Sequence, residues 1–172
     1  MGLHRVFVYG TLKTGFFNNY LIHQHGGTAK LIGLAKTKKK WPLVVASSCN
    51  IPYLLFKEDH STAKNVTGEV YEVDDEKLAV LDKLEAHPVY YERDYLEVDY
   101  LNSEGSQQKP QGSSAETAQV LAYFLKNFQD YLLDLPTMAT YDECPDLNKY
   151  IPPMERTEES RVNHRYEVIK AK

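Results

Sequence analysis

The sequence near the N-terminus reads Val6-Phe7-Val8-Tyr9-Gly10-Thr11-Leu12-Lys13, and no other stretch says more about the fold and the site. Its four apolar and aromatic residues favour a β-strand, and the glycine after them favours a tight turn. A turn of this kind exposes successive backbone N–H groups, which together form an anion-binding nest. Many first strands end in such a turn without binding anything, so the stretch predicts a ligand loop only with support from elsewhere.

A nucleotide-binding loop is the first alternative for this turn, because Gly10 and Gly15 have the spacing of the two glycines of a Walker A motif. That motif needs a Lys and then a Ser or Thr to reach phosphate and magnesium. Phe16 and Phe17 stand at those positions, and the sequence has no G-x-G-x-x-G motif. The turn is therefore expected to hold a small carboxylate rather than a triphosphate.

Length and composition predict one globular domain with a sizeable core, since 42% of the 172 residues are hydrophobic. The formal net charge of −4 argues against a nucleic-acid-binding protein. A basic cluster at 36–40 is typical of a solvated hairpin tip, and a phosphate-binding patch is the alternative. The sequence shows neither a signal peptide nor an apolar run long enough to span a membrane. We therefore expect a cytoplasmic protein that binds neither nucleic acid nor membrane.

The sequence predicts no metal site and no nucleophile. Cys49 and Cys144 lie far apart and form no C-x-x-C pair. His23 and His25 have no third ligand at helical or strand spacing, so surface positions are expected for them. The chain also lacks the G-x-S-x-G elbow of a nucleophilic serine. If the protein is an enzyme, a lone carboxylate that acts as acid and base fits best.

The order of elements predicts a mixture of short strands and few helices. Asn18 and Asn19 are expected to cap a short helix that ends near Gly26, and acidic residues followed by a proline predict a helix over 74–88. Residues 102–117 are expected to be a loop, the chain from 141 an irregular coil, and 158–172 a loose end. Alternating or apolar runs predict strands at 30–37, 43–46, 51–56, 66–73, 91–101 and 119–125.

Glu85 stands where helix physics does not favour a carboxylate. On an ideal helix it follows Leu78 and Leu81 at i+7 and i+4, on the buried side. It also lies in the last turn, where the partial negative charge of the helix dipole disfavours an acid. A catalytic role and a boundary glutamate paired with Arg93 explain this position equally well. Asp82, by contrast, is expected to point to a solvated flank.

Six short motifs, in order, resemble the γ-glutamyl cyclotransferase superfamily, most closely its γ-glutamylamine cyclotransferase branch. No one of them is specific, but the ordered set is. The resemblance runs from about residue 6 to about residue 153, Tyr141-Asp142 and the proline-bearing segment included. The motifs are Tyr9-Gly10-Thr11-Leu12-Lys13, Trp41-Pro42-Leu43, Asn50-Ile51-Pro52-Tyr53-Leu54-Leu55, Gly68-Glu69-Val70-Tyr71, Leu81-Asp82-Lys83-Leu84-Glu85 and Tyr91-Glu92-Arg93.

The resemblance implies an α+β fold, in which a mostly antiparallel or mixed sheet curls into a small barrel with helices packed around it. It implies a domain over 1–157 with 102–117 as a loop insertion, and it leaves 158–172 as a polar C-terminal tail. No metal and no cofactor are implied, and we expect a monomer whose partner is a small γ-glutamyl substrate.

The resemblance also implies a reaction, the release of 5-oxo-L-proline from a γ-glutamyl compound. The branch favours L-γ-glutamyl-L-ε-lysine, the dipeptide left after proteolysis of transglutaminase crosslinks. Tyr53 stands where the family has tryptophan, and it is expected to line a narrow exit for the leaving group. The residues that the resemblance assigns are Glu85 as the catalytic acid and base, and Tyr9, Gly10, Thr11 and Leu12 as the substrate loop.

The residues agree with this chemistry, because attack of an α-amine on its own γ-carbonyl needs no external nucleophile. One carboxylate can take the proton of the α-ammonium and give it to the departing amine. Three alternatives stay open. The same fold could act on glutathione or γ-glutamyl amino acids, the loop could serve a non-catalytic carboxylate-binding module, or the basic cluster at 36–40 could make this an interaction protein.

Overall fold

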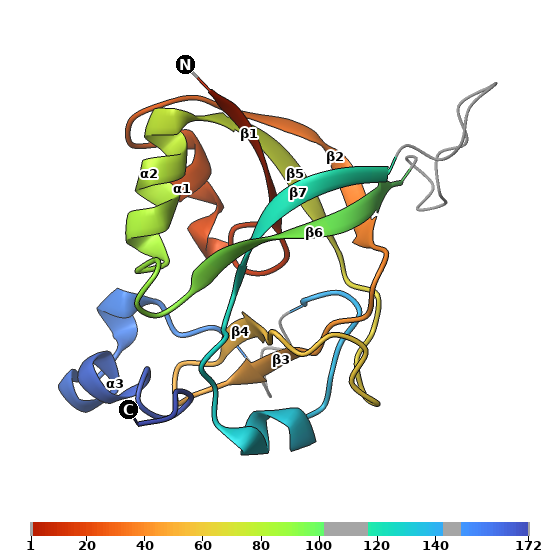
Figure 1. Cartoon of the computed structure of the whole chain (residues 1–172). Helices are drawn as coiled ribbons and strands as arrows, with labels where there is room; N and C mark the ends of the chain where they lie inside the picture. The colour runs from red at the N-terminus through yellow and green to blue at the C-terminus, as the bar shows by residue number, and fades with distance from the viewer. Residues whose placement is uncertain (1, 102–116, 143–148, 172) are drawn as a thin grey trace.

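Five strands close into a small barrel in the computed structural model (Figure 1), which describes residues 2–101, 117–142 and 149–171. The order around the barrel is β1-β5-β2-β6-β7, and every neighbouring pair is antiparallel except β7 with β1. The expected α+β barrel is confirmed. The barrel strands are β1 (Leu3–Val8), β2 (Ala29–Thr37), β5 (Thr67–Asp74), β6 (Glu92–Tyr100) and β7 (Thr117–Phe124).

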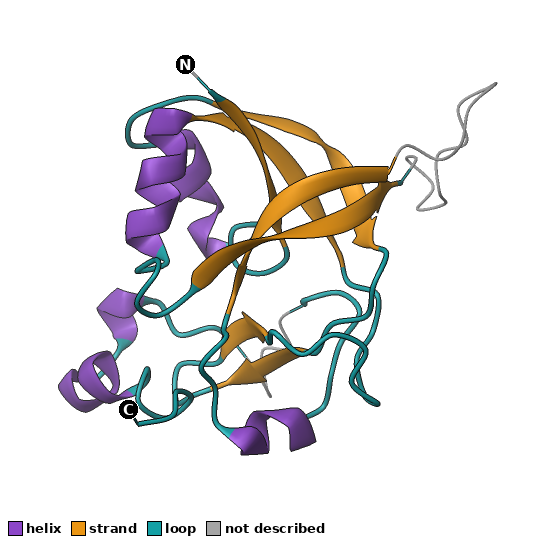
Figure 2. Ribbon diagram, viewed as in Figure 1, coloured by secondary structure: helices purple, strands orange, loops and turns teal. Residues whose placement is uncertain are grey.

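The remaining elements are short and lie outside the barrel (Figure 2). The strands β3 (Leu43–Ala46) and β4 (Ile51–Leu54) form a separate hairpin, so all the expected strands are present with slightly different ends. Within the described residues no helix is long and apolar enough to cross a membrane. The helical elements are η1 (Phe17–Asn19), α1 (Tyr20–His23), α2 (Asp75–Leu84), η2 (Asp130–Asp134), η3 (Pro153–Glu155) and α3 (Glu158–Asn163).

The first strand shows how alternation builds two apolar clusters. Phe7 and Tyr9 join a cluster to which every barrel strand contributes, and this cluster fills the barrel. Val6 and Val8 point the other way, into a second cluster outside the barrel, the outer cluster, which also holds Leu78 and is covered by the helices. The strand is therefore buried on both faces, which fixes the position of the turn that follows it.

The helix α2 begins and ends for identifiable reasons. The Asp74 carboxylate caps it by accepting a hydrogen bond from the backbone N–H of Lys77 at 2.8 Å. The helix was expected to reach residue 88 but ends at Leu84, because Ala86 has a φ of 49° in the left-handed region and cannot continue it. Glu85 is thus the residue that closes the helix.

Two expectations outside the barrel were wrong. Asn18 and Asn19 lie in η1 and at the start of α1, but neither side chain caps a helix, since both are hydrogen-bonded to the turn after β1. The stretch from residue 158 is not loose: it contains α3, and Val168 is fully buried in the outer cluster. Residues 102–116 of the expected loop lie outside the described part, and Thr117 already belongs to β7.

Candidate active site

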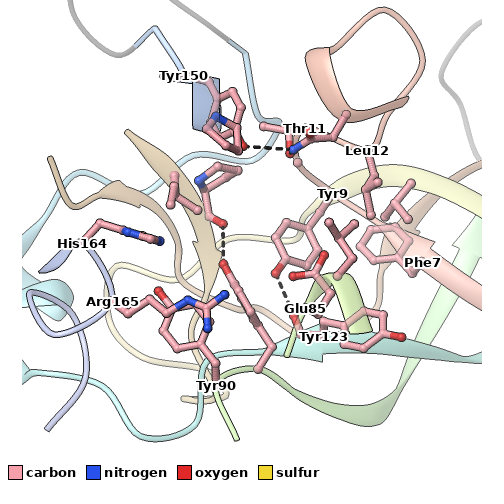
Figure 3. Close-up of a pocket in the computed structure, with 18 of the residues that line it drawn as sticks. Phe7, Tyr9, Thr11, Leu12, Glu85, Tyr90, Tyr123, Tyr150, His164 and Arg165 are labelled. Carbon is pink, nitrogen blue, oxygen red and sulfur yellow. Dashed lines mark hydrogen bonds between the residues drawn. The ribbon is translucent and has the colours of Figure 1, made fainter. Parts of the chain in front are cut away.

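A pocket of about 210 Å³ opens where the turn after β1 meets the end of α2 (Figure 3). Tyr9, Gly10, Thr11 and Leu12 all line it, and so does Glu85. The structure therefore brings together the five residues that the sequence singled out, from two segments more than 70 positions apart in the chain. Residues from the C-terminal segment close the opposite wall.

The turn after β1 presents unused backbone donors. The N–H of Lys13 donates to the Gly10 carbonyl at 3.1 Å and closes the turn. Within the described part of the chain, the backbone N–H groups of Gly10, Thr11 and Leu12 donate no hydrogen bond to the protein. Free N–H groups on consecutive residues at the edge of a pocket are suited to bind a carboxylate or an oxyanion.

Two asparagine side chains hold this turn in place. The Asn18 amide donates to the Thr11 hydroxyl at 2.8 Å and to the Tyr150 hydroxyl at 3.2 Å. The Asn19 amide donates to the Leu12 carbonyl at 2.8 Å. The sequence offered these residues as helix caps, and nothing in the local pattern distinguishes a cap from a brace to a distant loop. The bracing leaves the N–H side of the turn open.

Gly10 is required for close packing rather than for an unusual backbone angle. A Cβ at this position would lie 2.7 Å from Cγ of Pro52 in β4, closer than real Cβ atoms approach a neighbour. The backbone of Gly10 is not in the left-handed region, whereas that of Gly15 is, with a φ of 86°. The turn therefore rests directly on the β3-β4 hairpin.

Behind the turn, Lys13 has a structural position. Its side chain is 7% exposed, and its ammonium donates to the Tyr141 carbonyl at 2.8 Å and lies 4.8 Å from the centre of the Phe16 ring. Burial lowers the pKa of this lysine. The buried Glu69 secures the next residue by accepting from the backbone N–H of Thr14 at 2.9 Å. Neither charged side chain lines the pocket.

Glu85 is half-buried at the C-terminal end of α2, near Tyr9 and Tyr123 (Figure 3). Burial raises the pKa of its carboxyl from 4.5 to about 7, and the positive charge of Arg165 opposes part of that rise. Within the described residues, its carboxyl oxygens accept no hydrogen bond from another side chain or from the backbone. A carboxyl in this state exchanges protons near neutral pH and is free to contact a ligand.

Two sequence expectations about the neighbours of Glu85 were wrong. Arg93 does not pair with Glu85, because its Nε lies 2.9 Å from Oδ1 of Asp82, an ion pair without hydrogen-bond geometry. Asp82 is not on a solvated flank either: it is about one quarter exposed and accepts a hydrogen bond from the Tyr123 hydroxyl at 2.7 Å. Asp82 thus positions a pocket wall and is unsuitable as a neutral control.

Five tyrosines contribute to the wall of the pocket. The Tyr9 hydroxyl donates to the Tyr123 carbonyl at 2.7 Å, and that of Tyr91 donates to the Pro52 carbonyl at 3.2 Å. Burial raises the pKa of both Tyr9 and Tyr91 well above 10, so these rings stay neutral. Tyr53 was expected to line the exit but lies behind the wall, fully buried and stacked on Tyr91.

The C-terminal segment supplies pocket residues that sequence reasoning missed. Arg156, from the expected coil, and His164 and Arg165, from the stretch 158–172 that was expected to be loose, all line the pocket. The only signal in the sequence was the presence of several basic side chains in this segment. Their convergence on the pocket could not be predicted, because it depends on the packing of Val168 and α3 against the domain.

Within the described ranges, no group of three or more His, Cys, Asp or Glu side chains is placed to hold a metal ion.

Comparison with known proteins relates this chain to one family. The model of the family "Gamma-glutamyl cyclotransferase, AIG2-like" matches residues 6–143. A gamma-glutamylaminecyclotransferase of Mus musculus is 37% identical over 149 residues, which cover 86% of this chain and 95% of the mouse protein. Gamma-glutamylaminecyclotransferase C of Danio rerio is also 37% identical, over 85% of this chain and 91% of its own length.

A solved structure agrees with these relatives. The crystal structure of a mouse AIG2-like protein superimposes with a TM-score of 0.77 at 34% identity. The superposition covers 91% of this chain and all of the mouse chain. The fold and the arrangement of elements are thus similar along most of both proteins.

Proposed function

The chain belongs to the gamma-glutamyl cyclotransferase, AIG2-like family and is a cyclotransferase acting on γ-glutamyl compounds, and we propose that its substrate is L-γ-glutamyl-L-ε-lysine. The reaction would release 5-oxo-L-proline and free lysine. Its role would be the last step in degrading transglutaminase crosslinks, after proteolysis of the joined proteins. The observation that carries the proposal is Glu85, a carboxyl with a pKa of about 7 in one pocket with three free backbone donors.

Glu85 would begin the reaction as a base. The α-ammonium of the γ-glutamyl group gives it a proton, and the freed amine attacks the γ-carbonyl carbon to form the new C–N bond. Because the nucleophile and the carbonyl belong to one molecule, the enzyme contributes mainly by holding the chain in the five-membered-ring geometry. The aromatic walls from Tyr9, Tyr91 and Tyr123 limit the other conformations of the bound chain.

Glu85 would then act as an acid. The proton that it carries passes to the leaving nitrogen, and the bond from that nitrogen to the carbonyl carbon breaks. The regenerated carboxylate takes the second proton from the ring nitrogen and gives it to the released amine, which leaves as an ammonium. One group can perform both transfers efficiently only if its pKa lies near the working pH. The pKa of about 7 meets that condition.

The turn after β1 would bind the negative charge of the substrate. Its three free N–H groups, on Gly10, Thr11 and Leu12, can address either the α-carboxylate or the oxyanion that forms on the attacked carbonyl. Asn18 and Asn19 keep the turn rigid, so little rearrangement is needed when charge develops. The product 5-oxoproline keeps both oxygen functions and should therefore bind here by itself.

The preference for the ε-lysine compound is supported by the relatives' names and by the shape of the site. Two relatives that match over most of their length are named gamma-glutamylaminecyclotransferases. In such a substrate the leaving nitrogen sits on a methylene stem, which suits the aromatic wall. In glutathione and γ-glutamyl amino acids, a carbon bearing a peptide or a carboxylate lies directly beside that nitrogen.

The test is a release assay for 5-oxoproline with γ-glutamyl-ε-lysine, glutathione and γ-glutamyl-alanine as substrates. We expect kcat/KM to be highest for the ε-lysine compound. Faster turnover of γ-glutamyl-alanine or glutathione would assign the protein to a different substrate class. Absence of 5-oxoproline from all three would contradict the proposed function itself.

A further inference from the structure

A second cavity of about 570 Å³ adjoins the pocket of Glu85. The two share five lining residues, and the second extends from them along α3 and the residues that follow it. Three arginines contribute to its lining, two of them at the junction with the first pocket. The shared residues are Tyr90, Pro153, Arg156, His164 and Arg165, and Arg161 lines the second cavity alone.

Arg165 lies at the junction of the two cavities, against the ring of Tyr90, which is itself held in place. Its guanidinium carbon lies 4.8 Å from the centre of the Tyr90 ring, a cation–π contact. The Tyr90 hydroxyl is hydrogen-bonded to that of Tyr53 at 2.9 Å, so the ring cannot swing away. Figure 3 shows Arg165 and His164 across the pocket from Glu85. A chain leaving Glu85 in this direction passes the Tyr90 ring and meets Arg165.

The arginines of this cavity are not tied up in ion pairs among the described residues, although the charge of Arg165 acts on Glu85. Within the described residues, none of the carboxylates forms an ion pair with Arg156, Arg161 or Arg165. Arg156 and Arg161 are held instead by backbone carbonyls, at 2.9 Å and 3.2 Å respectively. An arginine held by neutral groups beside a cavity keeps its charge for a ligand, and its planar fork suits a carboxylate.

His164 does not add to that charge. Its Nδ1 donates to the Ser160 carbonyl at 2.7 Å, which leaves Nε2 as the unprotonated nitrogen of the neutral ring. Burial lowers the pKa of this histidine, and the nearby arginines lower it further. The cation at the junction is therefore guanidinium at any pH near neutrality.

We propose that Arg165, assisted by Arg156 and Arg161, binds a carboxylate at the far end of the leaving amine and so selects the substrate. This inference rests on the proposed function, because it concerns the leaving group of that reaction. In γ-glutamyl-ε-lysine, four methylenes and the α-carbon separate the leaving nitrogen from the carboxylate, which can reach the second cavity. In γ-glutamyl-alanine one carbon separates them, and the carboxylate stays beside Glu85, where like charges repel.

All three arginines lie outside the part of the chain that the family model matches. That match ends at residue 143, and all three arginines follow it. They reach the site because Val168 is buried in the outer cluster and anchors the segment. The preference for a distant carboxylate is thus encoded in a part of the sequence that the family model does not describe.

The experiment compares two substrates that differ only in the distant group. γ-Glutamyl-6-aminohexanoate carries a carboxylate at the end of its stem, and γ-glutamyl-hexylamine carries a methyl group. For the unmodified protein we expect kcat/KM to be about 10- to 100-fold higher for the carboxylate substrate, the range for a charge-assisted contact. Arg165→Gln should remove most of this ratio. Arg165→Glu should favour γ-glutamyl-cadaverine, whose stem ends in an ammonium, over γ-glutamyl-6-aminohexanoate.

The ratio of the two kcat/KM values is compared because Arg165 also lowers the pKa of Glu85. That influence changes turnover of both substrates alike and cancels when the two are compared. The matched control is Arg5→Gln, since Arg5 is an exposed arginine on β1 that lines neither cavity. This variant should leave the ratio unchanged.

Each outcome separates the two proposals. Equal kcat/KM for the two substrates in the unmodified protein, or an unchanged ratio in Arg165→Gln, would overturn the assignment of Arg165 while 5-oxoproline release still upheld the reaction. Failure to release 5-oxoproline from γ-glutamyl-ε-lysine, from γ-glutamyl-6-aminohexanoate and from γ-glutamyl-hexylamine would instead overturn the proposed function.

Discussion

Replacement of Glu85 by Gln should lower the activity and raise the stability of the fold. The amide keeps the shape of the side chain but can neither accept nor donate the transferred proton. We expect kcat/KM for γ-glutamyl-ε-lysine to fall by about two to four orders of magnitude, the usual contribution of a positioned acid and base. In the unmodified protein, kcat/KM should rise with pH through about 7, because Glu85 must start as a carboxylate.

The same substitution should stabilise the fold at alkaline pH. The folded-state pKa of about 7 lies above the unfolded value near 4.5, so ionising Glu85 costs stability as pH rises from about 4.5 to about 7. The full shift corresponds to about 3 kcal/mol, and water at the pocket mouth reduces this to about 2 kcal/mol. The amide that replaces the carboxyl does not ionise, so the variant does not lose this stability as pH rises. For a chain of 172 residues, this raises Tm by about 4–8 °C at pH 8.

The assay is thermal unfolding of both proteins at pH 5 and pH 8, together with 5-oxoproline release. Glu76→Gln is the matched control, since Glu76 is an exposed residue in the first turn of the same helix and does not line the pocket. It should change neither quantity appreciably. The reasoning is refuted if folded Glu85→Gln keeps more than a tenth of the activity, or if its gain in Tm is the same at both pH values.

Three further substitutions test the loop. Gly10→Val should abolish binding of 5-oxoproline in a calorimetric titration, because the side chain collides with Pro52 and displaces the turn, whereas Gly33→Ala, with only an ordinary contact, should leave binding intact. Asn18→Ala removes two braces of the turn, and we expect KM to rise about 5- to 30-fold with the fold preserved by circular dichroism. Lys13→Ala should lower the free energy of unfolding in urea by about 1–3 kcal/mol while 5-oxoproline affinity changes less than threefold.

The barrel was predictable because its strands carry local signals. Alternating or continuous apolar runs, separated by turn residues, gave every strand to within a few positions. The closure of the barrel was not in those signals: it came from the resemblance, since pairing β1 with β7 is a contact between distant segments. The helix α2 was found from its acidic first turn, but its end was not, because Ala86 adopts a left-handed conformation that sequence assigns to glycine or asparagine.

The candidate site was predictable at two places, the turn after β1, from its apolar strand and its glycine, and Glu85. Glu85 could be noticed because a carboxylate on an apolar helix face needs an explanation. The supports of the site gave no such signal. Asn18 is as ordinary in a turn as in a cap, Asp82 lies at a helical position typical of solvent, and Arg165 belongs to a polar stretch with no periodicity. Each acquires its contact through tertiary packing, which a local pattern does not encode.

The features that make Glu85 costly to the fold are the ones that the proposed proton transfer requires. Partial burial removes water from the carboxylate, and the C-terminal end of α2 adds a partial negative charge of the same sign. Burial raises the pKa of the carboxyl to about 7, whereas a glutamate in solution would remain too weak a base. The positive charge of Arg165 acts in the opposite direction and lowers the pKa of the carboxyl. If both proposals hold, one side chain of the C-terminal segment, Arg165, would lower the pKa of Glu85 and also bind the leaving group.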